Sequence, residues 1–552
     1  MIRYPGKDWE TGRDSMHYRW PEDVVFEQLT LEVEDKGCTD CGSMMSICDH
    51  RHRRVFTLKG PLRMTMKLTH CPKKSCPRRT KTVSAEAELG IAVPNWAIAW
   101  DVFVWIGHRR FSRHWTVGQI RGELIDSYGI RLSEDAIEKY IKRYEVMLAA
   151  RQQDAEQLRQ AYEGIDDLIL SIDGLQPEKG HETLYVVREL RGRRVWFAEP
   201  LLSSAEGEIR KLVEKAGQWA EQLGKPVRGW VSDKQEAFVK TIGKVFPGVP
   251  HRYCQNHFMR DLAKPVLEAD SNAKVKLRNK VRGLREIERE IATPQAEQKK
   301  TATAAEGVVL DYCSAIRGIL NDNQGSPVYP AGLQMLDGLK TVRESLQVNM
   351  ELSIDTPTQR QLERLAECID GGIERVEGRF QQIRGQVEDI RQVQKTLDPE
   401  TGNSEQRQRV FDELRNGFAQ RSDEVAQHMV GVMDRFKPGL FAGGDDLDMP
   451  RDNLDEERWF KNPKSHERRI TGRRHTGTRI VQEGATMMLA IDAHILHPGP
   501  FTVVELKPYR KAQVPESQKA AIHRRKVMRN ARSRKTLKKL LTALEERYRK
   551  AG

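Results

Sequence analysis

A short apolar run that ends in a carboxylate is the feature that most constrains this fold. Residues 166–174 read Asp-Asp-Leu-Ile-Leu-Ser-Ile-Asp-Gly, a run that is rich in Leu and Ile and too short for a typical helix. Such a run between turn residues predicts a buried β-strand. A carboxylate on the last residue of that strand, Asp173, is held rigidly at a sheet edge, where it can meet a ligand. Because Asp-Gly also favours turns, a turn aspartate is the alternative interpretation.

Further strands and helices follow this run and predict an α/β domain over residues 164–258. Apolar patterns favour strands at residues 181–190, 194–199, 227–233 and 249–254, with helices at about 203–223 and 236–246. The fourth strand again ends in a carboxylate, Asp233. This order of elements is that of the ribonuclease H-like fold, in which the first and fourth strands are neighbours. The resemblance therefore implies that Asp173 and Asp233 converge.

Two converging carboxylates suit hard divalent cations, and a pair of Mg²⁺ ions can activate an attacking oxygen and stabilise the leaving one. The motifs Ser-Ile-Asp-Gly, Val-Ser-Asp-Lys and Tyr-Cys-Gln-Asn-His-Phe resemble those of the DDE transposases of bacterial insertion sequences and Mutator-like elements. Those enzymes carry a Cys-x-x-His after the second aspartate, which Cys254 and His257 match. On the residues alone, this pair is half of a metal site or a buried thiol beside a surface histidine. We favour a structural or DNA-positioning role.

Length and charge indicate several domains and a polyanionic partner. The chain has 552 residues, and 92 Lys and Arg exceed 79 Asp and Glu, which gives a net charge of +13. No apolar run approaches the length of a membrane span, and the N-terminus lacks the apolar core of a secretion signal. We therefore expect no membrane association and a cytoplasmic, nucleoid-associated protein. Its eight cysteines are expected to be thiols or metal ligands rather than disulfides.

Paired cysteines near the N-terminus predict a zinc-ribbon-like module over residues 25–90. Cys38 and Cys41 form one hook and Cys71 and Cys76 a second, and a β-prone hairpin separates the two hooks. Zn²⁺ takes four soft ligands at tetrahedral corners, and each hook supplies two. Because four residues rather than two separate the second pair, Cys48, His50 and His70 are possible substitutes. We expect the zinc to be structural, since four cysteines leave no open coordination position.

Residues 91–163 predict a helical segment that resembles a helix-turn-helix, with its turn at Gly129 and its second helix at about residues 134–148. Ser133 is a plausible N-cap for that second helix. The Trp residues of this segment are expected to lie in a core. Four basic residues are candidates for DNA contacts: Arg109, Arg110, Arg113 and Arg131.

Residues 259–449 are almost free of strand patterns and predict an all-helical insertion. Apolar residues recur at three- and four-residue steps between Leu362 and Ile390, which favours one long helix packed in coiled-coil fashion, with a possible interruption at Gly371 and Gly372. In the resembled family, such an insertion separates the second aspartate from a final glutamate. Its role is expected to be dimerisation or gripping DNA.

Residues 450–497 are expected to return the chain to the core and to supply the third acid. If Asn453 is an N-cap, Glu456 falls at the third helical position, where its side chain folds back to the cap. Glu457 then remains free, and it lies three residues before Phe460, as the family pattern requires. We therefore choose Glu457, with Glu456 in reserve; first-turn acids favoured by the helix dipole are the alternative. Four arginines here are natural phosphate ligands: Arg468, Arg469, Arg473 and Arg474.

The last segment, residues 498–552, is predicted to be a basic tail along the DNA backbone. The resemblance implies a multidomain α+β protein with a ribonuclease H-like core, interrupted by the helical insertion and preceded by the zinc and helical modules. Its activity would be cleavage and transfer of double-stranded DNA at terminal inverted repeats and target sites, with two Mg²⁺ (Mn²⁺ may substitute). Two active sites acting on two ends imply a homodimer or larger assembly. The alternatives are a structure-selective nuclease on the same fold and a domesticated, non-catalytic DNA-binding regulator.

Overall fold

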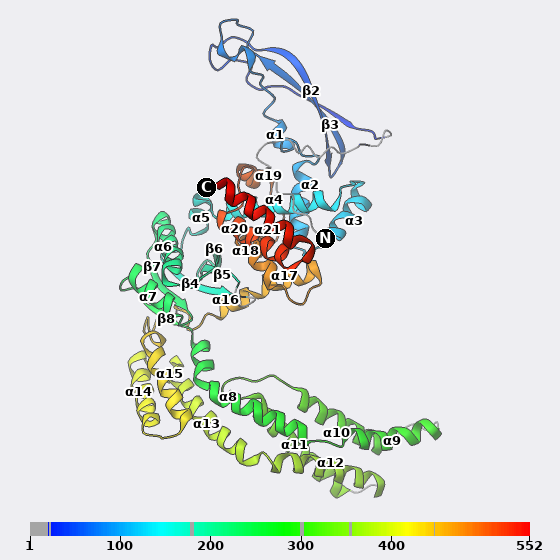
Figure 1. The fold of residues 1–552 in the computed structure, drawn as a ribbon, viewed down its shortest axis with the longest axis vertical. Helices are drawn as coiled ribbons and strands as arrows, with labels where there is room; N and C mark the ends of the chain where they lie inside the picture. Colours follow the sequence, from blue (N-terminus) through cyan, green and yellow to red (C-terminus); the bar gives the residue numbers. More distant parts are fainter. Residues whose placement is uncertain are drawn as a thin grey trace. The chain divides into compact units, whose positions relative to one another are not determined.

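The computed structural model describes residue 20 and residues 24–176, 181–298, 303–352, 356–446 and 448–551. The chain divides into two compact units (Figure 1): the first comprises Met1–Trp230, Glu236–Val249 and Leu454–Gly552, and the second Val231–Gln235 and Pro250–Asn453. The N-terminal stretch in which we expect no secretion signal lies outside the described residues. Among the residues that are described, no helix is both long and apolar enough to cross a bilayer.

The first unit begins with a three-stranded sheet of order β1-β3-β2, built from β1 (Glu27–Leu31), β2 (Ser46–Thr57) and β3 (Gly60–His70). The strands β2 and β3 form an antiparallel hairpin, as predicted, and β1 pairs with β3 in parallel. A short 3₁₀ helix, η2 (Pro77–Thr80), and α1 (Glu88–Ile91) follow. Buried positions alternate along β3, and the small apolar core lies near the hairpin turn, with Val55, Leu62 and Met64 at its centre.

Four helices follow: α2 (Trp100–Phe111), α3 (Val117–Tyr128), α4 (Glu134–Gln152) and α5 (Ala155–Ala161). Asn95 has a left-handed backbone (φ 67°), and α2 begins five residues later, at Trp100. Gly129 ends α3 in the left-handed region (φ 65°), and the Ser133 side chain caps α4, as predicted. A Cβ at Gly107 would overlap the Tyr144 ring, so α2 and α4 pack closely.

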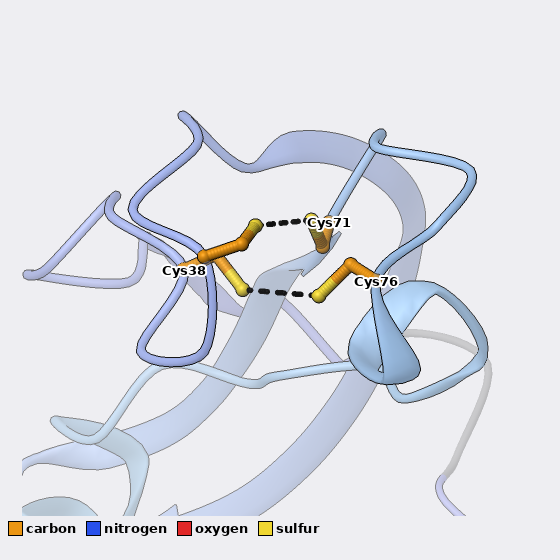
Figure 2. Close-up of side chains that lie close together, drawn as sticks. Cys38, Cys71 and Cys76 are labelled. Atoms are coloured by element: carbon orange, nitrogen blue, oxygen red, sulfur yellow. Dashed lines mark hydrogen bonds between the residues drawn. The ribbon is translucent and has the colours of Figure 1, made fainter.

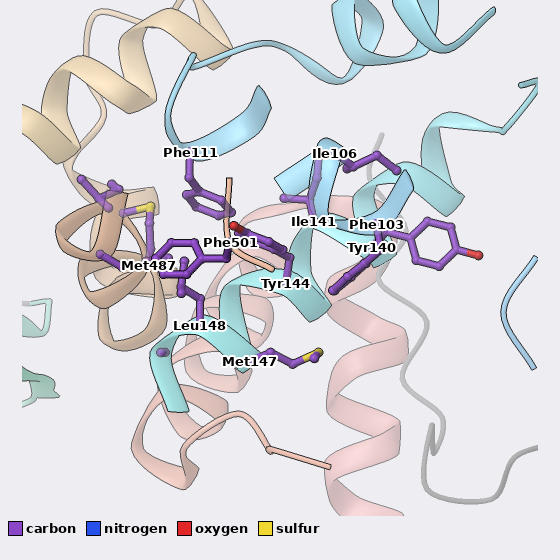
Figure 3. Packing of buried hydrophobic residues seen from close by; sticks show 14 of the residues in the cluster. Phe103, Ile106, Phe111, Tyr140, Ile141, Tyr144, Met147, Leu148, Met487 and Phe501 are labelled. Atoms are coloured by element: carbon purple, nitrogen blue, oxygen red, sulfur yellow. The ribbon is translucent and has the colours of Figure 1, made fainter. Parts of the chain in front are cut away.

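Trp100 and Trp105 of this segment are buried in a core, as we expected, and Trp96 and Trp115 are partly buried against it. Figure 3 shows Phe103 and Phe111 of α2 beside Tyr140 and Tyr144 of α4, together with Met487 from the C-terminal part of the chain. The predicted apolar stripe of α4 is buried. Its exposed positions are Glu134, Asp135, Glu138 and Lys139. Because three of these four side chains are acidic, α4 is poorly suited to enter a DNA groove as a recognition helix.

The central sheet has five strands in the order β6-β5-β4-β7-β8. They are β4 (Leu168–Leu175), β5 (Thr183–Glu189), β6 (Arg194–Leu201), β7 (Val227–Ser232) and β8 (His251–Tyr253), with α6 (Glu206–Leu223) and α7 (Glu236–Val245) between strands. Neighbours β4 and β5 are antiparallel, as are β5 and β6. The strands β4 and β7, which are the first and fourth of this sheet in chain order, are adjacent, as predicted.

Helices cover both faces of this sheet. Tyr185 and Val187 of β5 join a core cluster with α6 and α7, whereas Leu184 and Val186 join the cluster that contains α4 and α18 (Gly477–Leu496). This alternation follows from the two-residue period of a strand. The other C-terminal elements of the unit are α16 (Leu454–Trp459), α17 (Lys461–Thr471), α19 (Val503–Leu506), η4 (Lys507–Tyr509), α20 (Glu516–Arg532) and α21 (Arg534–Ala551).

Only part of the predicted basic tail is exposed, because its first helix packs against the rest of the first unit. Gln518 and Ala521 of α20 are buried, and α20 packs against α18. Arg524 and Arg525 both pair with the buried carboxylate of Glu182. The helix α20 is therefore part of the folded unit, and α21, which has no buried residue, is the part that remains exposed.

The second unit is all-helical after β8 in its described residues, apart from one isolated bridge (Ser326 with Tyr329), which agrees with the predicted insertion. Its helices are α8 (Gln255–Lys280), α9 (Leu284–Gln298), α10 (Ala304–Asn321), α11 (Ala331–Leu352), α12 (Thr356–Glu374), α13 (Glu377–Thr396), α14 (Ser404–Ala419) and α15 (Glu424–Leu440), with η3 (Pro399–Thr401) before α14. The prediction of one long helix is wrong, because the helix is interrupted at Val376, between α12 and α13. Gly371 and Gly372 lie inside α12, and a Cβ at Gly372 would press on Val281.

Candidate functional site

Asp173 is the sixth residue of β4, and the strand continues for two residues beyond it, whereas we predicted that the strand ends there. The five residues before it are buried, and Asp173 itself is half-buried. The Gly174 amide donates a hydrogen bond of 2.7 Å to Asp173 Oδ1. A Cβ at Gly174 would lie 2.9 Å from Thr183 and Tyr185, so only glycine fits against the neighbouring strand. The rigid strand thus fixes the position of this carboxylate.

Asp233 follows β7 directly and belongs to the second unit. Its Oδ1 accepts a hydrogen bond of 3.1 Å from the Gln235 amide. Burial raises the pKa of Asp233 and the Asp261 carboxylate adds to this rise, while the Gln235 hydrogen bond and His257 oppose it. A half-buried carboxylate near a second carboxylate would be stabilised in its charged form by a cation.

Cys254 and His257 lie at the start of α8, near Asp233. The Cys254 Sγ and a ring nitrogen of His257 are within 4.8 Å of each other. The thiol is fully buried and accepts a hydrogen bond from the Asn453 amide (3.3 Å), and the Cys254 amide donates to Ser232 O (2.8 Å). Cys254 therefore joins the end of β7 to the segment that leads out of the insertion, which fits the structural role that we favoured.

Arg252 of β8 holds the same returning segment. Its guanidinium is buried and donates to the carbonyl oxygens of Ala442 (2.7 Å), Met449 (2.7 Å) and Gly444 (3.2 Å). Sequence reasoning missed this residue, because a lone arginine inside a short strand carries no pattern that marks it as buried. Arg252 and Cys254 together fix the end of the insertion immediately before the helix that carries the predicted third acid.

That helix, α16, places Glu456 at its third position, as predicted, with its side chain fully buried. Glu457 is half-buried. Two contacts hold α16 within the first unit. Arg188 of β5, itself buried, forms an ion pair with Asp455. Asp492 of α18, which is also buried, accepts hydrogen bonds of 2.9 Å from the Trp459 indole and from the Val195 amide.

We expect Asp492→Asn to lower the free energy of unfolding of the first unit by about 2 to 3 kcal/mol, because an amide offers one acceptor where two buried donors need one each. All nine Trp residues that the structure describes lie in this unit, so Trp fluorescence during urea unfolding reports on it. Asp126→Asn, at an exposed position of α3, is the control and should leave the transition unchanged. An unchanged midpoint for Asp492→Asn would contradict this anchoring role.

The three predicted acids are divided between the units. Asp173 and Glu457 belong to the first unit, and Asp233 belongs to the second, together with Cys254 and His257. Of the predicted arrangement, the structure contains the neighbouring strands β4 and β7. The convergence of the three carboxylates, and the choice of Glu457 over Glu456, stay predictions.

The predicted DNA-contacting arginines differ in exposure. All four arginines near the end of α17 are exposed: Arg468, Arg469, Arg473 and Arg474. Arg113 and Arg131 are also exposed. Arg109 is half-buried, and its guanidinium carbon lies 5.0 Å from the ring centroid of Trp105 and 5.3 Å from that of Trp115. The DNA contact predicted for Arg110 is wrong, because this side chain is buried and donates to the Trp115 carbonyl oxygen.

Arg110 belongs to a buried polar network that sequence reasoning missed. Burial lowers the pKa of Arg110 to about 10 and raises that of the nearby Glu467 to about 7. Arg479 of α18 lies 3.5 Å from Glu467, and Lys142 of α4 pairs with Glu145 at 2.7 Å. The network joins α2, α4, α17 and α18. No local signal separates these charged residues from surface ones, since their partners come from distant parts of the chain.

The four predicted zinc ligands form one cluster, in which each Sγ atom lies within 4.8 Å of the others (Figure 2). Cys38 and Cys76 are 3.7 Å apart, and Cys41 and Cys71 are 3.5 Å apart. Tetrahedral Zn²⁺ with Zn–S bonds of about 2.3 Å requires sulfur atoms roughly 3.8 Å apart, so the donor set fits a structural zinc ion.

The loops around the thiols have the local geometry of metal hooks. The Gly42 amide donates to Cys38 O (2.8 Å), with Gly42 in the left-handed region (φ 69°), and Cys76 is the N-cap residue that precedes η2. Hydrogen bonds from Ser43 lower the pKa of Cys41 to about 6, which favours the thiolate that a metal needs. The possible substitutes Cys48, His50 and His70 are not members of this cluster.

No protein-family model matches the chain, and no relative was found among curated proteins.

Proposed function

We propose that the chain is a DNA transposase that binds terminal inverted repeats and catalyses strand cleavage and strand transfer, with Asp173, Asp233 and Glu457 as its metal-binding acids. The observation that carries the proposal is the order of the central sheet. The strand that contains Asp173 and the strand that leads into Asp233 are neighbours, as the ribonuclease H-like fold requires. A long helical insertion then separates the second aspartate from the helix that carries Glu457.

The residues present suit a magnesium site. Carboxylate oxygens are the ligands that Mg²⁺ prefers, and Asp233 is half-buried near a second carboxylate, Asp261, whose charge a bound cation would compensate. When bound, paired Mg²⁺ or Mn²⁺ ions would lower the barrier to in-line displacement at phosphorus. The protein holds the acids: β4 fixes Asp173, the end of β7 carries Asp233, and the Arg188 and Asp492 contacts fix α16.

Exposed basic surfaces support a DNA partner. Arg468, Arg469, Arg473 and Arg474 lie close together in the sequence and are exposed, within the same unit as Asp173 and Glu457. Residues 516–552 contain thirteen Lys and Arg against three Glu, a net charge of +10 out of +13 for the whole chain. Such a concentration of charge suits the phosphate backbone, whose neutralisation releases counterions.

The test is a strand-cleavage and joining assay on DNA that flanks the gene and ends in an inverted repeat. We expect Mg²⁺-dependent cleavage at the repeat end and joining of a pre-cut 3′ hydroxyl to a second duplex, both abolished by EDTA. Cleavage without joining would favour the nuclease. Sequence-specific binding without Mg²⁺-dependent nicking, unchanged by Asp173→Ala, would favour the non-catalytic regulator.

A further inference from the structure

The helix α21 carries an apolar stripe that stays exposed in the described part of the chain, although α20 packs beside it. Leu537, Leu541, Leu544 and Tyr548 follow one another at steps of four, three and four residues along the helix. Their exposed fractions are 38%, 48%, 39% and 84%, and no residue of α21 is buried. A row of exposed apolar side chains on a well-formed helix marks a surface that binds a partner.

We propose that this stripe is a self-association surface that pairs with α21 of a second copy of the chain in antiparallel orientation. The four-three-four spacing is that of the a and d positions of a two-helix coiled coil. In the antiparallel register, Leu537 of one copy meets Tyr548 of the other, and Leu541 meets Leu544. A two-fold axis generates each contact twice, which gives four continuous apolar layers.

The flanking charges favour this occupant and this orientation. Lys538 and Glu545 each follow a stripe residue directly, at the position where coiled coils form ion pairs between helices. In the antiparallel pair, Lys538 of one copy lies beside Glu545 of the other, twice by symmetry. A parallel pair would bring residues of the same number level with each other and would form neither ion pair.

A groove between α20 and α21 offers room for the opposing helix. It has a volume of about 710 Å³, and Val527 and Met528 of α20 line it together with Leu544 and Tyr548 of α21. Because Tyr548 is the layer partner of Leu537, the Leu537 side chain of the second copy would enter this groove.

The inference does not rest on the proposed function, so its test contains neither DNA nor Mg²⁺. Sedimentation velocity of the full chain over a range of concentrations should show a dimer of twice the chain mass. We expect the double substitution Leu541→Asp and Leu544→Asp to weaken dimerisation by about a hundredfold or more, since it places four carboxylates in the apolar layers. Val504→Asp, at an apolar position of α19 that is 81% exposed, is the matched control and should leave the dimer intact.

A charge exchange tests the orientation. Lys538→Glu alone and Glu545→Lys alone should each weaken the dimer roughly tenfold, because each turns two attractions into two repulsions. The double variant should restore wild-type dimerisation. A monomeric wild-type chain, or a dimer that the Leu541→Asp and Leu544→Asp variant leaves intact, would overturn the proposal.

Discussion

Replacing Asp173 or Asp233 with Asn is expected to lower Mg²⁺-dependent strand cleavage by at least about a thousandfold, with DNA affinity unchanged or increased. An amide removes the negative charge and one oxygen ligand but keeps the shape of the side chain. If paired cations supply most of the charge stabilisation at phosphorus, the loss corresponds to roughly 4 kcal/mol or more of the barrier. Cleavage is measured on end-labelled repeat DNA, and affinity is measured by fluorescence anisotropy without a divalent metal.

The control for these variants is Asp166→Asn. Asp166 lies seven residues before Asp173, just before β4, and its side chain is exposed. Asp166→Asn changes the net charge of the chain by the same amount as Asp173→Asn. Because Asp166 is exposed and outside the proposed site, cleavage should stay within about twofold of wild type. If Asp173→Asn also keeps wild-type cleavage and a wild-type Mg²⁺ requirement, the acids on the sheet do not form the active site.

The same assay decides between Glu456 and Glu457. We expect Glu457→Gln to match the two aspartate variants in its loss of cleavage. Glu456 is fully buried in the first turn of α16, so Glu456→Gln should act mainly on stability, through the packing of that helix. A large loss of cleavage in Glu456→Gln with unchanged urea unfolding, and none in Glu457→Gln, would assign the third acid to the reserve position.

The sequence was sufficient where local pattern and burial coincide. The strand that contains Asp173 is apolar at most positions and is bounded by turn residues, so its position could be predicted to within two residues. The cap at Ser133 and the left-handed Gly129 define helix ends through contacts within a few residues. The cysteine hooks could also be predicted from local sequence, because both members of each pair lie on one short loop.

The predictions fail where distant parts of the chain determine the environment of a residue. Arg110 resembles a surface arginine in the sequence His-Arg-Arg-Phe, but its charged neighbours Glu467 and Arg479 come from α17 and α18. The helix α12 ends at Glu374 and Val376 caps α13, although the apolar period continues through this break. Gly372 of α12 packs tightly on Val281, which comes from a distant part of the sequence. Neither contact can be predicted from a sequence window of ten or twenty residues, because its partners lie outside such a window.

Removal of the metal from the N-terminal module is expected to unfold the outer half of its hairpin and to leave the rest of the chain folded. The first seven residues of β2 are exposed, and its only buried residues, Val55 and Phe56, lie near the hairpin turn. The apolar core is at that end, whereas the four thiols are at the other. Without a cation, the outer half has few apolar contacts to hold it, so its order depends on the free energy of metal binding, about 10 kcal/mol or more in small zinc domains.

Cys71→Ser is the substitution that tests this expectation, and Cys48→Ser is its matched control, because Cys48 lies on β2 outside the cluster. We expect wild type and Cys48→Ser to contain about one zinc ion per chain by elemental analysis, and Cys71→Ser to contain close to none. Hydrogen exchange should then be fast at residues 36–54 and 66–82 in Cys71→Ser and unchanged in the central sheet. Retained protection in these segments, or no zinc in wild-type protein purified without chelators, would show that hairpin pairing and hydrogen bonds between thiols are enough to fold the module.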